Sequence, residues 1–220
     1  MTKHEERKAR AKKIVAFLKK FYPEPKTELN YKTPFQLVVA VLMSAQCTDK
    51  VVNRVTEPLF KKYKTVKHFA NADLETLTKE ISSVTFFRNK AKAIICAAKI
   101  VERDFGGQIP KSVAELITLP GVAYKTANVV LGELYGMWEG IPTDTHVKRF
   151  AYRFDLSDNL DLYKISKDLE SLVPKKDWRY VNNGFVLYGR YVCKAHKHDC
   201  TVHELTAVWP ESRSRWLKIK

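Results

Sequence analysis

Apolar residues recur at intervals of three and four along most of this chain, which is the period of an amphipathic helix. Segments with this period lie near residues 8–21, 51–62, 73–82, 89–104 and 161–172. Thr33, followed by Pro34 and Gln36, marks one helix start, and Ser112 with Glu115 marks another. The alternation of apolar and polar residues that is typical of strands is nearly absent. The sequence therefore predicts an all-α fold.

The chain has a large positive charge, since 39 Lys and Arg residues against 24 Asp and Glu residues give a formal net charge of +15. Its 45% hydrophobic residues are enough for a core, which excludes a disordered polycation. No apolar run approaches the roughly 20 residues of a membrane span, and the charged N-terminus lacks the pattern of a secretory signal. Four scattered cysteines indicate a reducing compartment. We expect a polyanionic partner and no membrane, although charge alone also fits a merely basic protein.

The segment LPGVAYKTANVVL, which begins at residue 119, predicts two helices joined by a tight turn. Pro120 ends the first helix, Gly121 permits a left-handed turn, and the second helix begins near Ala123. The first N–H groups of the second helix then point outward with the positive end of its dipole, so they can bind a backbone phosphate. A helix corner without any ligand has the same local pattern.

Lys125 lies in the first turn of that second helix. The positive end of the helix dipole, together with partial burial, would disfavour the charged ammonium form and make free amine available. Such an amine can attack an electrophilic sugar carbon and form a Schiff base. A solvated lysine on a helix face is the alternative at this position.

Four motifs occur in the order found in one known family. They are LVVAVLMSAQCTDKVVN, VTFFRNKAKAI, LPGVAYKTANVVL followed by PTDTHVKR, and LYGRYVC. From about residue 35 to about residue 200, the chain resembles the endonuclease III branch of the helix–hairpin–helix (HhH-GPD) DNA glycosylases. The resemblance implies a six-helix domain at 27–138 that contains the helix–hairpin–helix motif. Residues 1–26 and 139–220 would form a second helical domain, with a DNA cleft between the two.

The resemblance places the family's lysine nucleophile on Lys125 and its catalytic aspartate on Asp144. The residues alone leave the role of Asp144 open. Thr143 or Asp144 could simply cap the helix that begins at Thr145. A carboxylate near a nucleophilic lysine could also stabilise a cationic sugar and assist proton transfer. The resemblance favours the catalytic role.

The resemblance also implies residues that contact DNA. Gln46 corresponds to the side chain that fills the stack after a base is extruded, although a buried amide at a helix end would explain it as well. Phe86, Phe87 and Arg88 stand where the family has Gly-Leu-Tyr, and the two aromatic rings could wedge into DNA or belong to the core. The remaining expected contacts are in the hairpin, at Gly121, Ala123, Tyr124 and Thr126.

Two kinds of bound ion follow from the same resemblance. A monovalent cation would bind the carbonyl groups of Ile117, Leu119 and Val122 in the hairpin. Relatives also hold a [4Fe–4S] cluster in a C-x6-C-x2-C-x5-C loop. In the corresponding loop at 193–209, Cys193 and Cys200 keep the first spacing, but His203 and Trp209 replace the last two cysteines.

We therefore expect no cofactor and no [4Fe–4S] cluster, with Trp209 packing the loop. The first alternative is zinc bound by Cys193, Cys200 and His203, with His196 or His198 as the fourth ligand. The second alternative is a degenerate iron–sulfur site.

The predicted function is that of a bifunctional DNA glycosylase and β-elimination AP lyase, which excises damaged pyrimidines from duplex DNA in base excision repair. We expect a monomer in the cytoplasm or nucleoid, or in the nucleus of a eukaryote. A uracil or mismatch glycosylase, or an AP lyase alone, is the alternative within the enzymes. A non-catalytic DNA-binding module is the alternative outside them, but it would need neither Lys125 nor Asp144. The segment LMSAQCTD lacks the glutamate of adenine-excising relatives.

Overall fold

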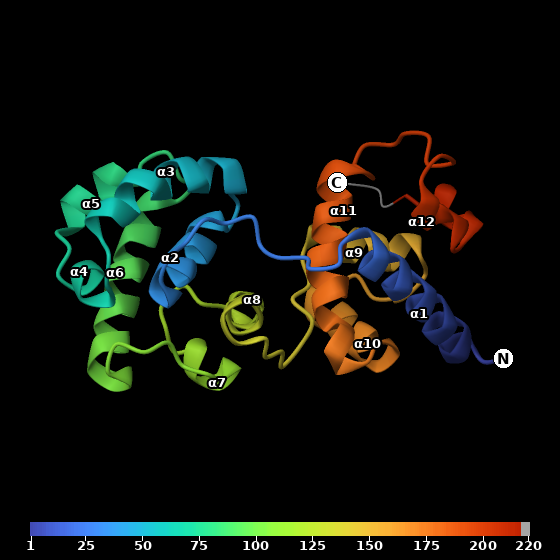
Figure 1. Cartoon of the computed structure of the whole chain (residues 1–220), viewed down its shortest axis with the longest axis horizontal. Helices are drawn as coiled ribbons and strands as arrows, with labels where there is room; N and C mark the ends of the chain where they lie inside the picture. The colour runs from blue at the N-terminus through green and yellow to red at the C-terminus, as the bar shows by residue number, and fades with distance from the viewer. Residues whose placement is uncertain (217–220) are drawn as a thin grey trace. The chain divides into compact units, whose positions relative to one another are not determined.

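The computed structural model describes residues 1–216, and within this range it contains helices and no strand (Figure 1). The prediction of an all-α fold is confirmed. The chain divides into two compact units, which are Thr27–Glu139 and Met1–Lys26 together with the chain from Gly140 onward. None of the described helices combines the length and the apolar character that a membrane span requires.

The unit Thr27–Glu139 is built around a central helix, α2. Residues 35–43 of α2 are all buried, and the helix packs against α3, α6 and α8. A helix that is apolar on every side must be enclosed in this way. The helices of this unit are α2 (Pro34–Ser44), α3 (Asp49–Lys62), α4 (Val66–Ala70), α5 (Leu74–Glu80), α6 (Phe87–Phe105), α7 (Val113–Leu116) and α8 (Tyr124–Tyr135).

The other unit joins the N-terminal helix to the C-terminal part of the chain. Its α-helices are α1 (Lys3–Phe21), α9 (Thr145–Arg153), α10 (Leu162–Leu172), α11 (Phe185–Tyr191) and α12 (Glu204–Ala207). Short 3-10 turns lie at Lys175–Asp177 and Pro210–Arg213, and a π-helical turn lies at Tyr180–Gly184. The π-helical turn contacts α1, and the buried side chains of Asn182 and Asn183 donate to the carbonyl oxygens of Pro142 and Pro25 at 2.6 and 3.0 Å.

Local signals located most helix starts, but they missed some tertiary contacts. The hydroxyls of Thr33 and Ser112 cap α2 and α7 as expected. The Gln36 side chain does not close a capping box on Thr33, because its oxygen accepts from the N–H of Lys32 and its nitrogen donates to the carbonyl of Tyr63 at 3.2 Å. The short helices α4, α11 and α12 were not predicted, since an apolar period needs more residues to be visible.

Arginines of α1 bind the C-terminal end of α9. Arg10 donates to the carbonyl oxygens of Phe154 and Asp155, both at 2.8 Å, and so satisfies carbonyls that the end of the helix leaves unpaired. Arg7 forms ion pairs with Asp155 at 3.0 Å and with Asp158 at 2.7 Å. Asp155 has a positive φ of 46°, a conformation that an aspartate tolerates better than most residues.

These ion pairs depress the pKa values of both carboxyl groups. Hydrogen bonds from Arg7 and Lys3 lower the pKa of Asp158 to about 2. Burial opposes ionisation of Asp155, but hydrogen bonds from Arg7 and Arg10 and charge interactions with Arg7 and Arg215 outweigh this and lower its pKa. A carboxyl group with a lower pKa in the folded state stabilises the fold above its unfolded pKa of about 4 and loses this effect as the pH falls.

Asp155→Asn should therefore destabilise the protein at about pH 6 and have less effect at about pH 2, where the carboxyl groups of the wild type become protonated. Urea unfolding of both proteins across this pH range measures the difference. A destabilisation that stays constant down to pH 2 would show that Asp155 acts through its backbone conformation and not through its charge.

Candidate functional site

The hairpin between α7 and α8 sits against the core of its unit. Gly121 has a φ of 82°, and a Cβ atom at this position would lie 3.0 Å from Cδ2 of Leu42 on α2 and 3.3 Å from Cβ of Ala93 on α6. Leu119 and Val122 are buried, and the N–H of Val122 donates to the carbonyl of Leu119 at 3.0 Å. The turn therefore needs glycine both for its backbone conformation and for its close approach to two helices.

Lys125 is the second residue of α8, directly after this hairpin. Its side chain is exposed, so the expected partial burial is wrong. The reason is the helix period, because α8 turns Ala127, Asn128, Val130 and Leu131 toward the core and position 125 away from it. Ala123 at the N-cap provides no side-chain hydrogen bond to the first turn. The amine therefore lies on the surface, beside a helix start that no side chain caps.

Asn128 fixes the orientation of that first turn. Its buried amide donates to the carbonyl of Tyr124 at 3.1 Å and accepts from the N–H of Glu139 at 3.0 Å. The hydroxyl of Tyr124 donates to the carbonyl of Glu139 at 3.3 Å. Asn128 was not among the predicted site residues, although a lone amide on the apolar face of a helix signals such a link. Thr126, also expected to contact DNA, is partly exposed one position beyond Lys125.

Two exposed residues of the same unit have strained backbones. Gln46 follows α2 with a φ of 55°, and Phe86 precedes α6 with a φ of 56°. The hydroxyl of Thr85 donates to the carbonyl of Gln46 at 2.8 Å, which joins the two loops. A left-handed conformation costs such residues about 1–3 kcal/mol and is concentrated at functional sites. Both side chains are held at the surface, and Phe86 is 59% exposed.

The structure separates the alternatives that the sequence left open for these loops. Gln46 is exposed and is not the buried amide that was considered. Phe86 is exposed, whereas Phe87 is partly buried against the core, so only Phe86 is available as a wedge. The guanidinium of Arg88 lies 5.0 Å from the centre of the Phe87 ring.

The buried side chain of Lys90 links the loop of Gln46 to the loop of Phe86. Its buried ammonium donates to the carbonyl oxygens of Met43 and Ala45 at 2.8 and 2.6 Å, at the C-terminal end of α2. Burial lowers the pKa of Lys90. Because Lys90 belongs to α6, this contact connects the helix that precedes Gln46 to the helix that follows Phe86. The sequence contains no local signal for it.

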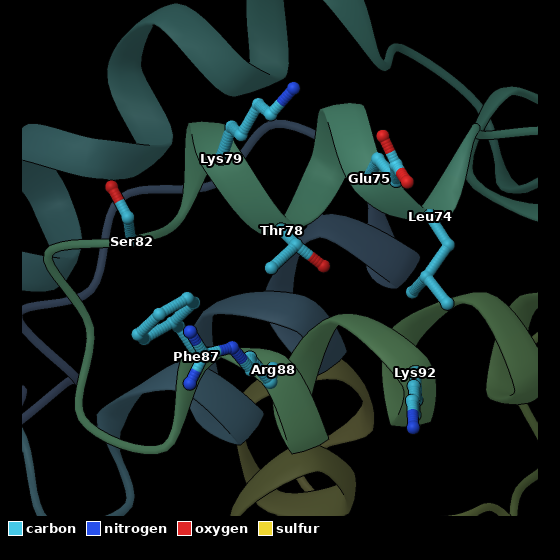
Figure 2. A pocket seen from close by; sticks show the side chains of 8 residues that line it. All are labelled: Leu74, Glu75, Thr78, Lys79, Ser82, Phe87, Arg88 and Lys92. Carbon is cyan, nitrogen blue, oxygen red and sulfur yellow. The ribbon is translucent and has the colours of Figure 1, made fainter.

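A groove of about 620 Å³ lies between α5 and α6, next to the loop that carries Phe86 (Figure 2). Residues of α5, of α6 and of the segment between them line it: Leu74, Glu75, Thr78, Lys79, Ser82, Phe87, Arg88 and Lys92. Figure 2 shows Arg88 beside the Phe87 ring at one end of α6. Three cationic side chains and one carboxylate give the groove a net positive charge, which suits an anionic ligand.

Asp144 is the N-cap residue of α9 in the other unit. Its Oδ1 atom accepts from the N–H groups of His146 and Val147 at 2.8 and 3.0 Å, and its Oδ2 atom lies 3.5 Å from Nδ1 of His146. Thr143 is not the cap, since its buried hydroxyl donates to the carbonyl of Ile141 at 3.0 Å. The cap fixes the orientation of the carboxylate, and a capping role is compatible with a catalytic one.

The loop at 193–209 contradicts the expectation of no cofactor. Cys193, His198, Cys200 and His203 each offer a ligand atom, and these four atoms lie within 4.8 Å of one another. The expectation of no cofactor, which rested on the family's cysteine spacing, is wrong, since these are the residues of the zinc alternative with His198 as the fourth ligand. Nε2 of His198 lies 3.5 Å from Sγ of Cys200. Trp209 is only partly buried, and its ring lies 4.1 Å from the guanidinium of Arg10.

Comparisons with known proteins agree on one family. Residues 39–175 match the HhH-GPD superfamily of base excision DNA repair proteins. The chain is 42% identical to endonuclease III of Synechocystis over 94% of this chain and 95% of that protein. It is 41% identical to endonuclease III of Bacillus subtilis over 88% and 89% of the two chains.

Solved structures give the same result. A trapped endonuclease III–DNA covalent intermediate superposes with a TM-score of 0.85 at 34% identity and covers 97% of this chain and 98% of that chain. A thermostable thymine-DNA glycosylase superposes with a TM-score of 0.78 over 90% and 94% of the two chains, but at 19% identity it shows only the fold.

Lys90→Met should destabilise the protein by about 1–3 kcal/mol, since it leaves two carbonyl groups at the end of α2 without their buried donor. Lys92→Met is the matched control, because Lys92 is exposed two positions further along α6 and should change the free energy of unfolding by less than about 0.5 kcal/mol. Urea unfolding compares the two. Equal effects would show that Lys90 does not hold the loop of Gln46.

Proposed function

This chain belongs to the HhH-GPD superfamily of base excision DNA repair proteins, and we propose that it acts as a bifunctional DNA glycosylase and AP lyase on damaged pyrimidines in duplex DNA. The single observation that carries the proposal is the position of Lys125, an exposed amine in the first turn of α8 directly after the hairpin. A protein that only bound DNA would not need an amine there.

In the proposed reaction, the amine of Lys125 attacks C1′ of the damaged nucleotide. A C–N bond forms as the glycosidic C–N bond breaks, and the base leaves with its bonding electrons and takes up a proton. The sugar ring opens to an imine on Lys125. Loss of a proton from C2′ then breaks the bond between C3′ and the 3′ phosphate oxygen. Water hydrolyses the remaining imine and restores the amine.

Asp144 is proposed to stabilise the positive charge that develops on the sugar and to assist proton transfer. The cap that it forms on α9 holds its carboxylate in one orientation before substrate binds. Such preorganisation removes the need to reorient a charge in the transition state. The proposal requires that Lys125 and Asp144 act on the same nucleotide.

The remaining residues are proposed to bind and deform DNA. The N–H groups at Gly121, Ala123, Tyr124 and Thr126 would contact a backbone phosphate, together with a monovalent cation on the carbonyls of Ile117, Leu119 and Val122. Gln46 and Phe86 would enter the base stack, since extrusion of a base costs a few kcal/mol and leaves a gap to fill. Arg88 and the groove beside it would add positive charge, so binding should weaken steeply with salt.

The proposed substrate is double-stranded DNA with a damaged base or an abasic site. The enzyme would act where that DNA is, in the cytoplasm and nucleoid of a bacterial cell. A preference for uracil, or lyase activity without base excision, is the alternative that a panel of lesion oligonucleotides separates from the proposal.

Lys125→Gln should abolish borohydride trapping on an abasic duplex and strand cleavage, because an amide cannot form the imine. Binding to an uncleavable abasic analogue should change by less than about tenfold, because the variant loses only one positive charge that can contact a DNA phosphate. Lys99→Gln, at an exposed lysine on α6, is the control and should trap normally. Normal trapping by Lys125→Gln would show that another amine is the nucleophile.

Asp144→Asn should lower base excision by about 100-fold or more while retaining part of the lyase activity on preformed abasic sites, because an abasic sugar needs less cationic stabilisation. Asparagine caps helices as well as aspartate does, so the free energy of unfolding should change by less than about 1 kcal/mol. Single-turnover assays on both substrates measure the split. Full excision activity in Asp144→Asn would reduce Asp144 to a capping residue.

A further inference from the structure

The four potential ligands in the loop after α11 form a compact set. We propose that Cys193, His198, Cys200 and His203 bind a single zinc ion, which fastens this loop to the end of α11. This inference does not depend on the proposed DNA chemistry. Two thiolates and two imidazoles form one of the common tetrahedral zinc ligand sets, and a site with four protein ligands leaves no position open for a substrate. The ion would therefore be structural.

The distances match one ion better than an iron–sulfur cluster. Bond lengths of about 2.3 Å to sulfur and about 2.0 Å to nitrogen in a tetrahedron place the two ligand atoms about 3.5 Å apart. Sγ of Cys200 and Nε2 of His198 lie 3.5 Å apart. A [4Fe–4S] cluster takes four cysteines, each on its own iron, and a two-iron cluster with two histidines places its thiolates and imidazoles on different irons. Such ligands would lie farther apart than these.

Hydrogen bonds to the backbone position Cys193, Cys200 and His203. The N–H of Cys193 donates to the carbonyl of Tyr188 at 2.8 Å, which sets Cys193 at the end of α11. The N–H of His203 donates to the carbonyl of Cys200 at 3.1 Å. The buried hydroxyl of Thr206 lies 2.7 Å from the carbonyl of Cys200 and closes the same turn. The loop is thus folded so that its cysteines and histidines converge.

Contacts outside the ligand set orient the donor atoms. Nδ1 of His198 lies 2.6 Å from the carbonyl of His196, so that its proton is on Nδ1 and the lone pair of Nε2 faces Cys200. Zinc-bound histidines typically make this second hydrogen bond to a carbonyl. The guanidinium of Arg153, which is 1% exposed, donates to Sγ of Cys193 at 2.7 Å. Within residues 1–216, Nδ1 of His203 is buried without a hydrogen-bond partner.

Elemental analysis of the full chain, purified from medium that contains both zinc and iron, tests the proposal. We expect about one zinc per chain, and replacement by cobalt should give the visible bands of a tetrahedral site and a thiolate-to-metal band in the near ultraviolet. Removal of the metal by a chelator should lower the thermal unfolding temperature, and added zinc should restore it.

Variants identify the ligands. His198→Ala should weaken zinc binding at least tenfold, and Cys200→Ser should also lose the near-ultraviolet cobalt band from its thiolate. His196→Ala and Cys96→Ser are matched controls, because both side chains are exposed and outside the ligand set, and they should keep full metal content. If Cys200→Ser fails to fold, titration of the metal-depleted wild-type protein with cobalt gives the number of metal ions bound per chain.

Three results would overturn the proposal. They are a chain without bound metal under these conditions, iron with acid-labile sulfide in place of zinc, and unchanged metal binding in His198→Ala. Borohydride trapping on an abasic duplex is measured separately with the metal-depleted protein. The zinc proposal and the proposed function can then fail independently of each other.

Discussion

The close approach of Gly121 to its neighbours determines how the unit Thr27–Glu139 presents its functional residues. A Cβ atom at position 121 would lie 3.0 Å from Leu42 on α2 and 3.3 Å from Ala93 on α6. These are the helices whose ends carry Gln46 and Phe86. The hairpin that positions Lys125 therefore packs against the same two helices that carry the loops proposed to enter the base stack. The close approach at Gly121 thus relates the positions of the hairpin and of both loops.

Buried and half-buried basic side chains complete the ends of helices in both units. Lys90 binds carbonyl oxygens at the end of α2, Arg10 binds those at the end of α9, and Arg149 donates to the carbonyls of Gly189 and Cys193 near the end of α11. Cations are favourable at the C-terminal ends of helices, where carbonyl groups lack partners. Part of the net charge of +15 therefore serves the fold, and the exposed remainder is available for DNA.

Features that depend on neighbouring residues were predictable, and features that depend on distant ones were not. The apolar period and the caps at Thr33 and Ser112 predicted the all-α class and several helix starts, and the proline and glycine at 120 and 121 predicted the hairpin. The hydrogen bonds of Lys90 join residues 47 and 45 positions apart in the chain, so no local pattern reveals them. His198 was undervalued as a ligand for the same reason, since only the folded loop brings it to Cys193.

We propose that Lys125 is the amine that becomes bonded to the sugar. Borohydride reduction of the wild-type protein on an abasic duplex, followed by nuclease and protease digestion and mass spectrometry, locates the modified residue directly. We expect a reduced sugar adduct on the peptide that contains Lys125 and on no other peptide. An adduct on the N-terminal amine of Met1, or on another lysine, with Lys125 unmodified would contradict it.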